Sequence, residues 1–132
     1  METEFEVLIY KTADGKEPLG DFLSTTDPKT YAKFLMEADL LQKHGNRLTM
    51  PYSKHLRDGI FELRIQAGGN IARVLYFFVS GRKIILTHGF AKKTKKTPKK
   101  EIDRAIACKA EWEGRNESKK PQPAEKGSPE KR

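Results

Sequence analysis

Two arginines and one histidine fall in three consecutive strand-like runs of the sequence, at Arg64, Arg73 and His88. Short glycine-containing links separate these runs, at Gly68–Gly69 and Ser80–Gly81. If each link is a two-residue hairpin loop, Arg64 lies directly opposite Arg73, and Arg73 lies opposite His88. Directly paired residues share one face of a sheet. The spacing therefore predicts a row of two arginines and a histidine across three adjacent strands.

Such a row has the groups needed to cleave RNA by attack of a ribose 2′-hydroxyl on the adjacent phosphate. A guanidinium binds phosphate through a planar, permanently charged fork, and two of them can stabilise the charge that develops on a transferring phosphoryl group. A histidine can move a proton near neutral pH. This chemistry needs no metal ion and no cofactor. Arg64, Arg73 and His88 are therefore the candidate catalytic residues of a metal-independent endoribonuclease.

Two interpretations of the arginine pair remain open at this point, because neighbouring arginines repel each other. In the first, Glu62 or a carboxylate from another part of the chain neutralises the pair. In the second, the pair binds an anion such as a phosphate group. His88 also has a structural interpretation, since a single histidine on a strand often only satisfies hydrogen bonds.

Positive charge is concentrated in one short segment after the last strand-like run. The chain of 132 residues has 26 Lys and Arg against 18 Asp and Glu, a formal net charge of +8. From Ala91 to Arg104, seven of fourteen residues are basic, and only Glu101 and Asp103 are acidic. A charged run is often just a solvated surface. Here the crowding of like charges makes a polyanionic partner an equally good interpretation.

Several other kinds of site and location are not expected. Cys108 is the single cysteine, which excludes an internal disulfide and a multi-cysteine zinc site. The three histidines lack metal-ligand spacing, so we expect no metal site. No run approaches the roughly 18 consecutive apolar residues that span a bilayer, and the acidic start is unlike a secretory signal. The sequence thus predicts a soluble cytoplasmic protein with no membrane contact.

Periodicity and capping signals predict an α+β fold. Strand-like runs cover residues 5–10, 61–67, 70–79 and 82–90, and helices are predicted to begin at Pro18, Pro28 and Pro98. Residues 47–59 carry breakers and are expected to be irregular. We expect a small antiparallel sheet made of the N-terminal strand and a three-stranded meander. N-terminal helices should pack on one face, and a C-terminal helix should follow.

The hydrophobic pattern also predicts the packed face and the domain boundary. With the loops assumed above, one face of the meander collects Phe61, Leu63, Ile65, Ala72, Val74, Tyr76, Phe78 and Ile85. Only Ala124 among the apolar residues lies beyond Trp112. Residues 1–112 should therefore form one domain, and residues 113–132 a basic, disordered tail.

Two stretches of the sequence resemble the RelE/ParE toxin superfamily. The first runs from Lys54 to Arg64 as Lys-His-Leu-Arg-Asp-Gly-Ile-Phe-Glu-Leu-Arg and continues in Ala72–Phe77. The second begins at His88 as His-Gly-Phe-Ala-Lys-Lys and ends in a Thr-Pro helix start. This second motif resembles the HigB-like, phage-related branch of the superfamily. The similarity covers roughly residues 5–112.

The resemblance implies the toxin of a toxin–antitoxin module, which cleaves mRNA in the ribosomal A site. A cognate antitoxin, often a helix-turn-helix protein, would hold it inactive. Arg64 and Arg73 carry over as the phosphate-binding arginines, and His88 matches a basic position of the motif. Tyr76 matches an aromatic position, although the predicted register places it on the packed face. The predicted RNA-binding residues are Lys54, Lys92, Lys93, Lys95 and Lys96.

Two rival functions come from other classes. A ParE-like protein would inhibit gyrase without cutting RNA, so that DNA damage would appear in place of new RNA ends. An inactive phage-derived RNA-binding protein would bind RNA with strong salt dependence and leave the message intact.

Overall fold

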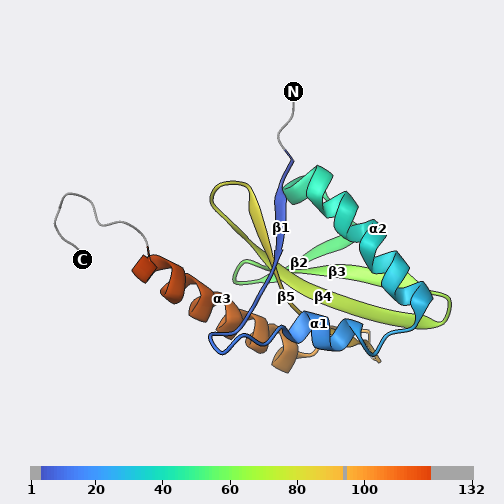
Figure 1. Cartoon of the computed structure of the whole chain (residues 1–132). Coiled ribbons are helices and arrows are strands. Elements are labelled where there is room, and N and C mark those ends of the chain that lie inside the picture. The colour runs from blue at the N-terminus through green and yellow to red at the C-terminus, as the bar shows by residue number, and fades with distance from the viewer. Residues whose placement is uncertain (1–3, 94, 120–132) are drawn as a thin grey trace.

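The computed structural model describes residues 4–93 and 95–119, which form a five-stranded sheet with helices on both faces (Figure 1). The elements are β1 (Glu6–Ile9), α1 (Pro18–Leu23), α2 (Pro28–His44), a 3-10 turn (Gly45–Arg47), β2 (Ser53–Arg57), β3 (Ile60–Ala67), β4 (Asn70–Val79), β5 (Lys83–Ala91) and α3 (Lys99–Lys119). The strands lie in the order β1-β5-β4-β3-β2. The predicted α+β class is confirmed. Within the described residues, none of the helices is long and apolar enough to span a membrane.

Local sequence signals fix both ends of α2. Pro28 occupies the first turn, and the Asp27 side chain accepts a hydrogen bond of 2.8 Å from the Thr30 N–H, as a helix N-cap does. Gly45 follows the last helical residue with a φ of +54°, and a Cβ there would collide with the Phe5 ring. Glycine is therefore required at this position for its backbone conformation and for space. The predicted helix and both of its ends are confirmed.

Two features of the sheet differ from the prediction. β1 pairs with β5 in parallel, so the sheet is mixed and not wholly antiparallel. The segment predicted to be irregular contains β2, which pairs with β3 at the edge of the sheet. The turn between these strands is Asp58-Gly59, in which both residues have the positive φ that a type I′ hairpin requires. β2 was missed because Lys54, His55 and Arg57 break the alternation of apolar and polar residues, although such residues suit an edge strand.

Each face of the sheet buries its own apolar cluster. α1 and α2 cover one cluster, and α3 covers the other. The predicted packed face is right for Phe61, Leu63, Ile65, Ala72, Val74, Tyr76 and Phe78. Ile85 was placed wrongly, because it faces α3 beside Phe77, while Ile84 takes the position on the α2 side. The β4–β5 loop has three residues, with Val79 opposite Lys83, and the extra residue reverses the faces of β5 from Lys83 to Leu86, before the bulge beside Leu75.

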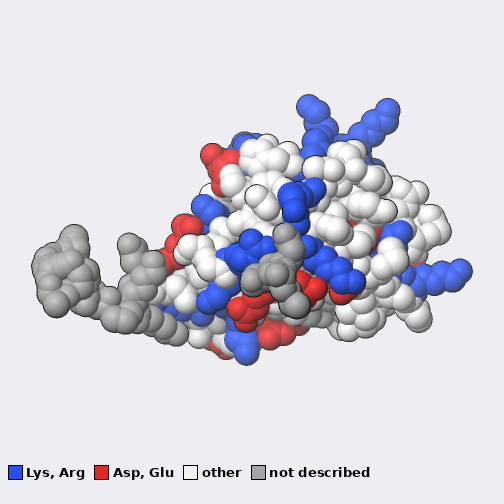
Figure 2. Space-filling view, turned by 90° about the horizontal axis from the view of Figure 1, so that it is seen from above, with Lys and Arg blue, Asp and Glu red and all other residues white. Residues whose placement is uncertain are grey.

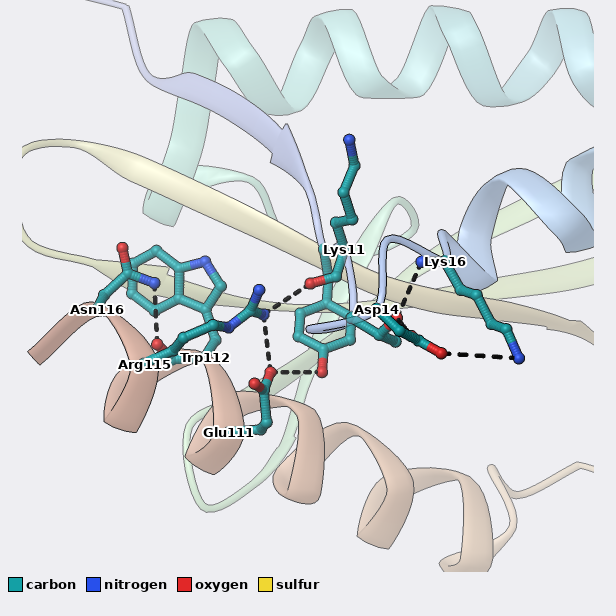
Figure 3. A network of polar contacts seen from close by, with 9 residues as sticks. Lys11, Asp14, Lys16, Glu111, Trp112, Arg115 and Asn116 are labelled. Carbon is teal, nitrogen blue, oxygen red and sulfur yellow. Dashed lines mark hydrogen bonds and ion pairs between the residues drawn. The ribbon is translucent and has the colours of Figure 1, made fainter. Parts of the chain in front are cut away.

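α3 is held against the end of β1 by polar contacts (Figure 3). The Tyr10 hydroxyl donates a hydrogen bond of 2.7 Å to Glu111 Oε1. Arg115 Nη2 donates to the Lys11 carbonyl oxygen at 2.6 Å and to the same Glu111 oxygen at 2.8 Å. The predicted boundary at Trp112 therefore falls inside a docked helix, and the first residues of the predicted tail belong to α3. Residues 120–132 of that tail lie outside the described residues.

Ending the chain at Glu113 should lower the free energy of unfolding by about 1–2 kcal/mol relative to a chain that ends at Lys119. The shorter chain loses the Arg115 hydrogen bonds to Lys11 and Glu111, and a net hydrogen bond contributes roughly 1 kcal/mol. Urea unfolding of the two truncated proteins measures the difference. Equal stability would show that the last turns of α3 contribute nothing.

Candidate functional site

The arginine pair lies where the sequence places it, but the histidine does not. Arg64 is directly opposite Arg73, as predicted. The predicted pairing of Arg73 with His88 is wrong, because Arg73 lies opposite Phe90 and His88 lies opposite Leu75. The three-residue β4–β5 loop and a bulge beside Leu75 together displace His88 by two positions. Since side chains alternate with period two, His88 stays on the same face as both arginines.

His88 is fully buried beneath the first turn of α3. Its Nε2 lies 3.0 Å from Glu101 Oε1, and its Nδ1 lies 3.0 Å from the Thr87 hydroxyl. Burial lowers the pKa of His88, and repulsion by Arg104 acts in the same direction, although Glu101 opposes both. A neutral imidazole here donates its Nε2 hydrogen to the Glu101 carboxylate. His88 thus attaches α3 to the sheet, and substrate cannot reach it in this conformation.

Glu62 is the centre of the polar contacts around the two arginines. Its carboxylate is buried, accepts a hydrogen bond of 2.8 Å from Arg64 Nη1, and lies 3.5 Å from Arg73 Nε. The Thr97 hydroxyl also donates to it, from the segment that leads into α3. Lys54 is its register partner on β2. One carboxylate therefore faces two guanidiniums and a lysine, so Glu62 neutralises the pair only in part.

Two adjoining cavities carry the predicted basic residues. The larger, of about 520 Å³, is lined by Arg64, Gln66, Ile71, Arg73, Lys92, Lys93 and Lys95. The smaller, of about 240 Å³, is lined by basic residues that include Lys54, Arg64, Lys92, Lys95 and Lys96. We call the two together the basic cleft. The structure thus brings together the two candidate arginines and all five predicted RNA-binding lysines, and leaves out His88.

Crowding in the basic cleft changes the acidity of its cations. Burial lowers the pKa of Arg73, and Arg64 adds to this effect. The pKa of Lys92 is also lowered, first by its partial burial and then by the charge of Arg73. Lys92 is therefore a better proton donor than an ordinary surface lysine. On the face shown in Figure 2, by contrast, Lys and Arg are interspersed with Asp and Glu.

A buried carboxylate that the sequence analysis did not identify lies behind the arginines. Glu37 of α2 is 2% exposed and lines a cavity of about 200 Å³ together with Arg64 and Arg73. Burial raises the pKa of Glu37 to about 7, against the opposing charges of Lys33 and Arg73. We call this space the Glu37 cavity. The signal in the sequence was a glutamate at helical spacing within the buried stripe of Thr30, Phe34, Glu37 and Leu41.

The glycine of the His-Gly-Phe motif has a steric role. A Cβ on Gly89 would lie 2.6 Å from Cδ2 of Phe22 and 3.3 Å from the Arg73 carbonyl oxygen. Glycine thus allows the α1 side chain to pack directly on β5, beside the strand that carries Arg73. The motif therefore allows α1 to pack closely against β5 near the end of this strand.

Replacing Gly89 by alanine should lower the free energy of unfolding by about 1–3 kcal/mol, because Phe22 must move out of a well-packed position. Gly69→Ala is the matched control, since a Cβ there meets no atom within 4 Å. Urea unfolding of both variants measures the effect. A Gly89→Ala protein as stable as the control would contradict this close packing.

Comparison with known proteins assigns the family. The sequence profile of the phage derived protein Gp49-like family (DUF891) matches residues 21–109. The match covers most of the chain, from α1 into α3, and includes every residue of the basic cleft. No curated protein matches the chain at a significant level. The predicted relationship to toxins is supported at the level of this family, and no match specific to HigB supports the narrower assignment. The chain belongs to the Gp49-like family of phage-derived proteins, which is related to the RelE-type toxins of toxin–antitoxin modules.

Proposed function

We propose that the protein is the toxin of a toxin–antitoxin module and cleaves mRNA on the ribosome as a metal-independent endoribonuclease. One observation supports this proposal above the others. Arg64 and Arg73 lie side by side in a cleft with five lysines, and Glu62 is the carboxylate that forms ion pairs with both of them. Such a surplus of cations suits a phosphodiester.

In this proposal the arginines bind the phosphate that is cut. Two guanidiniums that face the phosphoryl oxygens stabilise the charge of the transition state more than that of the ground state. Lys54, Lys93, Lys95 and Lys96 contact neighbouring phosphates, which adds affinity without sequence preference. Lys92, with its lowered pKa, gives a proton to the leaving 5′-oxygen.

His88 has a different role from the one expected from the sequence. It is buried and hydrogen-bonded to Glu101, so we assign it no proton transfer. Instead it positions the start of α3 and the lysine-rich segment that precedes this helix. His88→Gln should therefore affect protein stability more than the chemical step.

The ribosome and an antitoxin are the partners that this function requires. In-line attack needs the RNA backbone to be bent, and an open cleft on a small protein supplies little of that geometry, so the ribosome would provide it. An acidic segment of an antitoxin, in a cytoplasmic complex, would cover the basic cleft. A helix-turn-helix protein encoded by the neighbouring gene is the expected antitoxin.

Controlled expression in a bacterium tests the proposal. We expect protein synthesis to stop within minutes and new mRNA 5′ ends to appear at fixed positions within codons. A variant with Lys54, Lys92 and Lys95 changed to glutamine should produce neither effect. Growth arrest with intact messages and trapped gyrase would instead favour the ParE-like function, and RNA binding without either effect would favour the inactive protein.

A further inference from the structure

The Glu37 cavity and the basic cleft lie on two sides of the same arginines. Arg64 and Arg73 line both spaces, whereas Glu37 lines the Glu37 cavity and Lys92 lines the basic cleft. The Glu37 cavity opens at the surface, since Met50 and Tyr52 in its lining are exposed. A phosphate bound to the arginines would therefore have a carboxyl group on one side and an ammonium group on the other.

Two buried polar atoms near this cavity have no hydrogen-bond partner among the described residues. These atoms are Glu37 Oε1 and Arg73 Nε, and both side chains are more than nine-tenths buried. Glu37 forms a long ion pair with Lys33, whose Nζ lies 3.9 Å from the other carboxylate oxygen. Buried polar groups in proteins are nearly always satisfied. Glu37 Oε1 is therefore an acceptor without a donor, while Arg73 Nε has its ion pair of 3.5 Å with Glu62 but no hydrogen bond. This arrangement suits a ligand that brings a hydroxyl group to Glu37 and an anionic oxygen to Arg73.

The protonation behaviour of Glu37 suits a proton acceptor at neutral pH. Burial raises its pKa to about 7, and Lys33 and Arg73 limit that rise. Arg64 and Tyr52 are the other charged or titratable groups that line the cavity. A general base works best when its pKa is close to the working pH, and perturbed carboxylates in a cavity are concentrated at functional sites.

The size of the cavity favours a sugar. Its volume of about 200 Å³ is below the roughly 300 Å³ at which pockets for drug-sized ligands begin, so a single ring fits better than a whole nucleotide. Pro51 and Tyr52 add apolar lining, while the free carboxylate oxygen can accept a hydrogen bond from a hydroxyl group. A ribose attached to a phosphate on Arg64 and Arg73 meets these requirements.

We propose that Glu37 is a catalytic residue that takes the proton of the ribose 2′-hydroxyl beside the phosphate held by Arg64 and Arg73. This inference rests on the proposed function. The 2′-oxygen forms a bond to phosphorus as its proton passes to Glu37. The bond from phosphorus to the 5′-oxygen breaks, and that oxygen receives a proton from the Lys92 ammonium group. The products are a 2′,3′-cyclic phosphate and a 5′-hydroxyl. Glu37 then loses its proton to water and Lys92 regains one, so no oxidant or further reactant is needed.

Single-turnover cleavage of mRNA on programmed ribosomes by the full chain tests this role, with Glu37→Gln as the test variant. We expect a rate at least 100-fold lower with binding to the ribosome unchanged within twofold. For the wild type, the logarithm of the rate should rise with pH and level off near pH 7. The glutamine variant should lack this rise. Asp39→Asn is the matched control, because Asp39 lies on the same helix but is exposed.

The outcomes separate the two proposals. If the wild type cleaves and Glu37→Gln cleaves at a similar rate, or keeps the same rise with pH, the role of Glu37 is refuted and the proposed function stands. A variant that loses ribosome binding together with rate would refute it as well, because that pattern indicates a structural role. A wild type that does not cleave would refute the proposed function, and the role of Glu37 with it.

Discussion

Replacing Arg73 by glutamine should lower the single-turnover rate of ribosome-coupled cleavage by about 100- to 1000-fold, the range seen when one preorganised donor to a transition-state anion is removed. Arg73 is buried and held between Glu62, at 3.5 Å, and the carbonyl oxygen of Ala72, at 3.0 Å. Its guanidinium is therefore fixed before substrate binds. Rapid mixing of programmed ribosomes with an excess of protein measures the rate.

Two controls accompany this variant. Lys29→Gln removes a positive charge from an exposed position on α2 and should leave the rate unchanged. The melting temperature of Arg73→Gln shows whether the protein is folded, since Glu62 keeps its hydrogen bonds from Arg64 and Thr97. If a folded Arg73→Gln protein cleaves at the wild-type rate, Arg73 takes no part in the reaction.

Replacing Glu37 by glutamine should stabilise the protein at pH 8 by about 3 kcal/mol and leave its stability at pH 4 nearly unchanged. Burial raises the pKa of Glu37 from 4.5 to about 7, so the folded protein holds a proton that the unfolded chain has lost. At pH values between about 4.5 and 7 unfolding therefore releases that proton, and the stability of the wild type falls as the pH rises through this range. A glutamine carries no charge and avoids this loss. Urea unfolding at the two pH values measures the difference.

The matched control is again Asp39→Asn, whose exposed side chain pairs with Lys43 at the surface. It should change stability little at either pH, because exposed ion pairs contribute little. A Glu37→Gln effect of the same size at pH 4 and pH 8 would contradict a raised pKa. A variant that gains stability and loses activity is what we expect of a group kept for its chemistry.

Local signals were sufficient for most of the fold. Asp27, Pro28 and Gly45 fix the ends of α2 through a cap, a preset φ and a positive φ, all of which act within a few residues. Gly68-Gly69 likewise forms a two-residue loop and aligns Arg64 with Arg73. Elements of this kind can be predicted because their causes lie in neighbouring residues.

The β5 register could not be predicted in the same way. Arg82 adopts a φ of +59°, which lengthens the loop after β4, and nothing in the residue type favours that conformation. The bulge beside Leu75 adds a second displacement. The parallel pairing of β1 also depends on how distant parts of the chain pack, so the sequence pattern alone cannot distinguish it from antiparallel pairing.

In the candidate site, too, features of the local sequence could be predicted and tertiary contacts could not. Charge density in residues 91–104 pointed to the segment that carries Lys92, Lys93, Lys95 and Lys96, because crowded cations must face solvent or an anion, whereas Lys54 came from the family resemblance. The burial of His88 depends on α3 crossing the sheet and placing Glu101 over it, which is a tertiary contact. Glu37 was not identified because a glutamate on a helix usually faces solvent, and its position beside Arg73 follows only from the packing of α2 on the sheet.

The chemistry of the RNA ends is the most direct test of the proposed function. Purified full-length protein is added to ribosomes that hold a defined mRNA, and both new ends are analysed in the presence of a metal chelator. We predict cuts within the A-site codon that require the ribosome and leave a 2′,3′-cyclic phosphate and a 5′-hydroxyl. Intact mRNA on occupied ribosomes, or ends with a 5′-phosphate, would contradict the account.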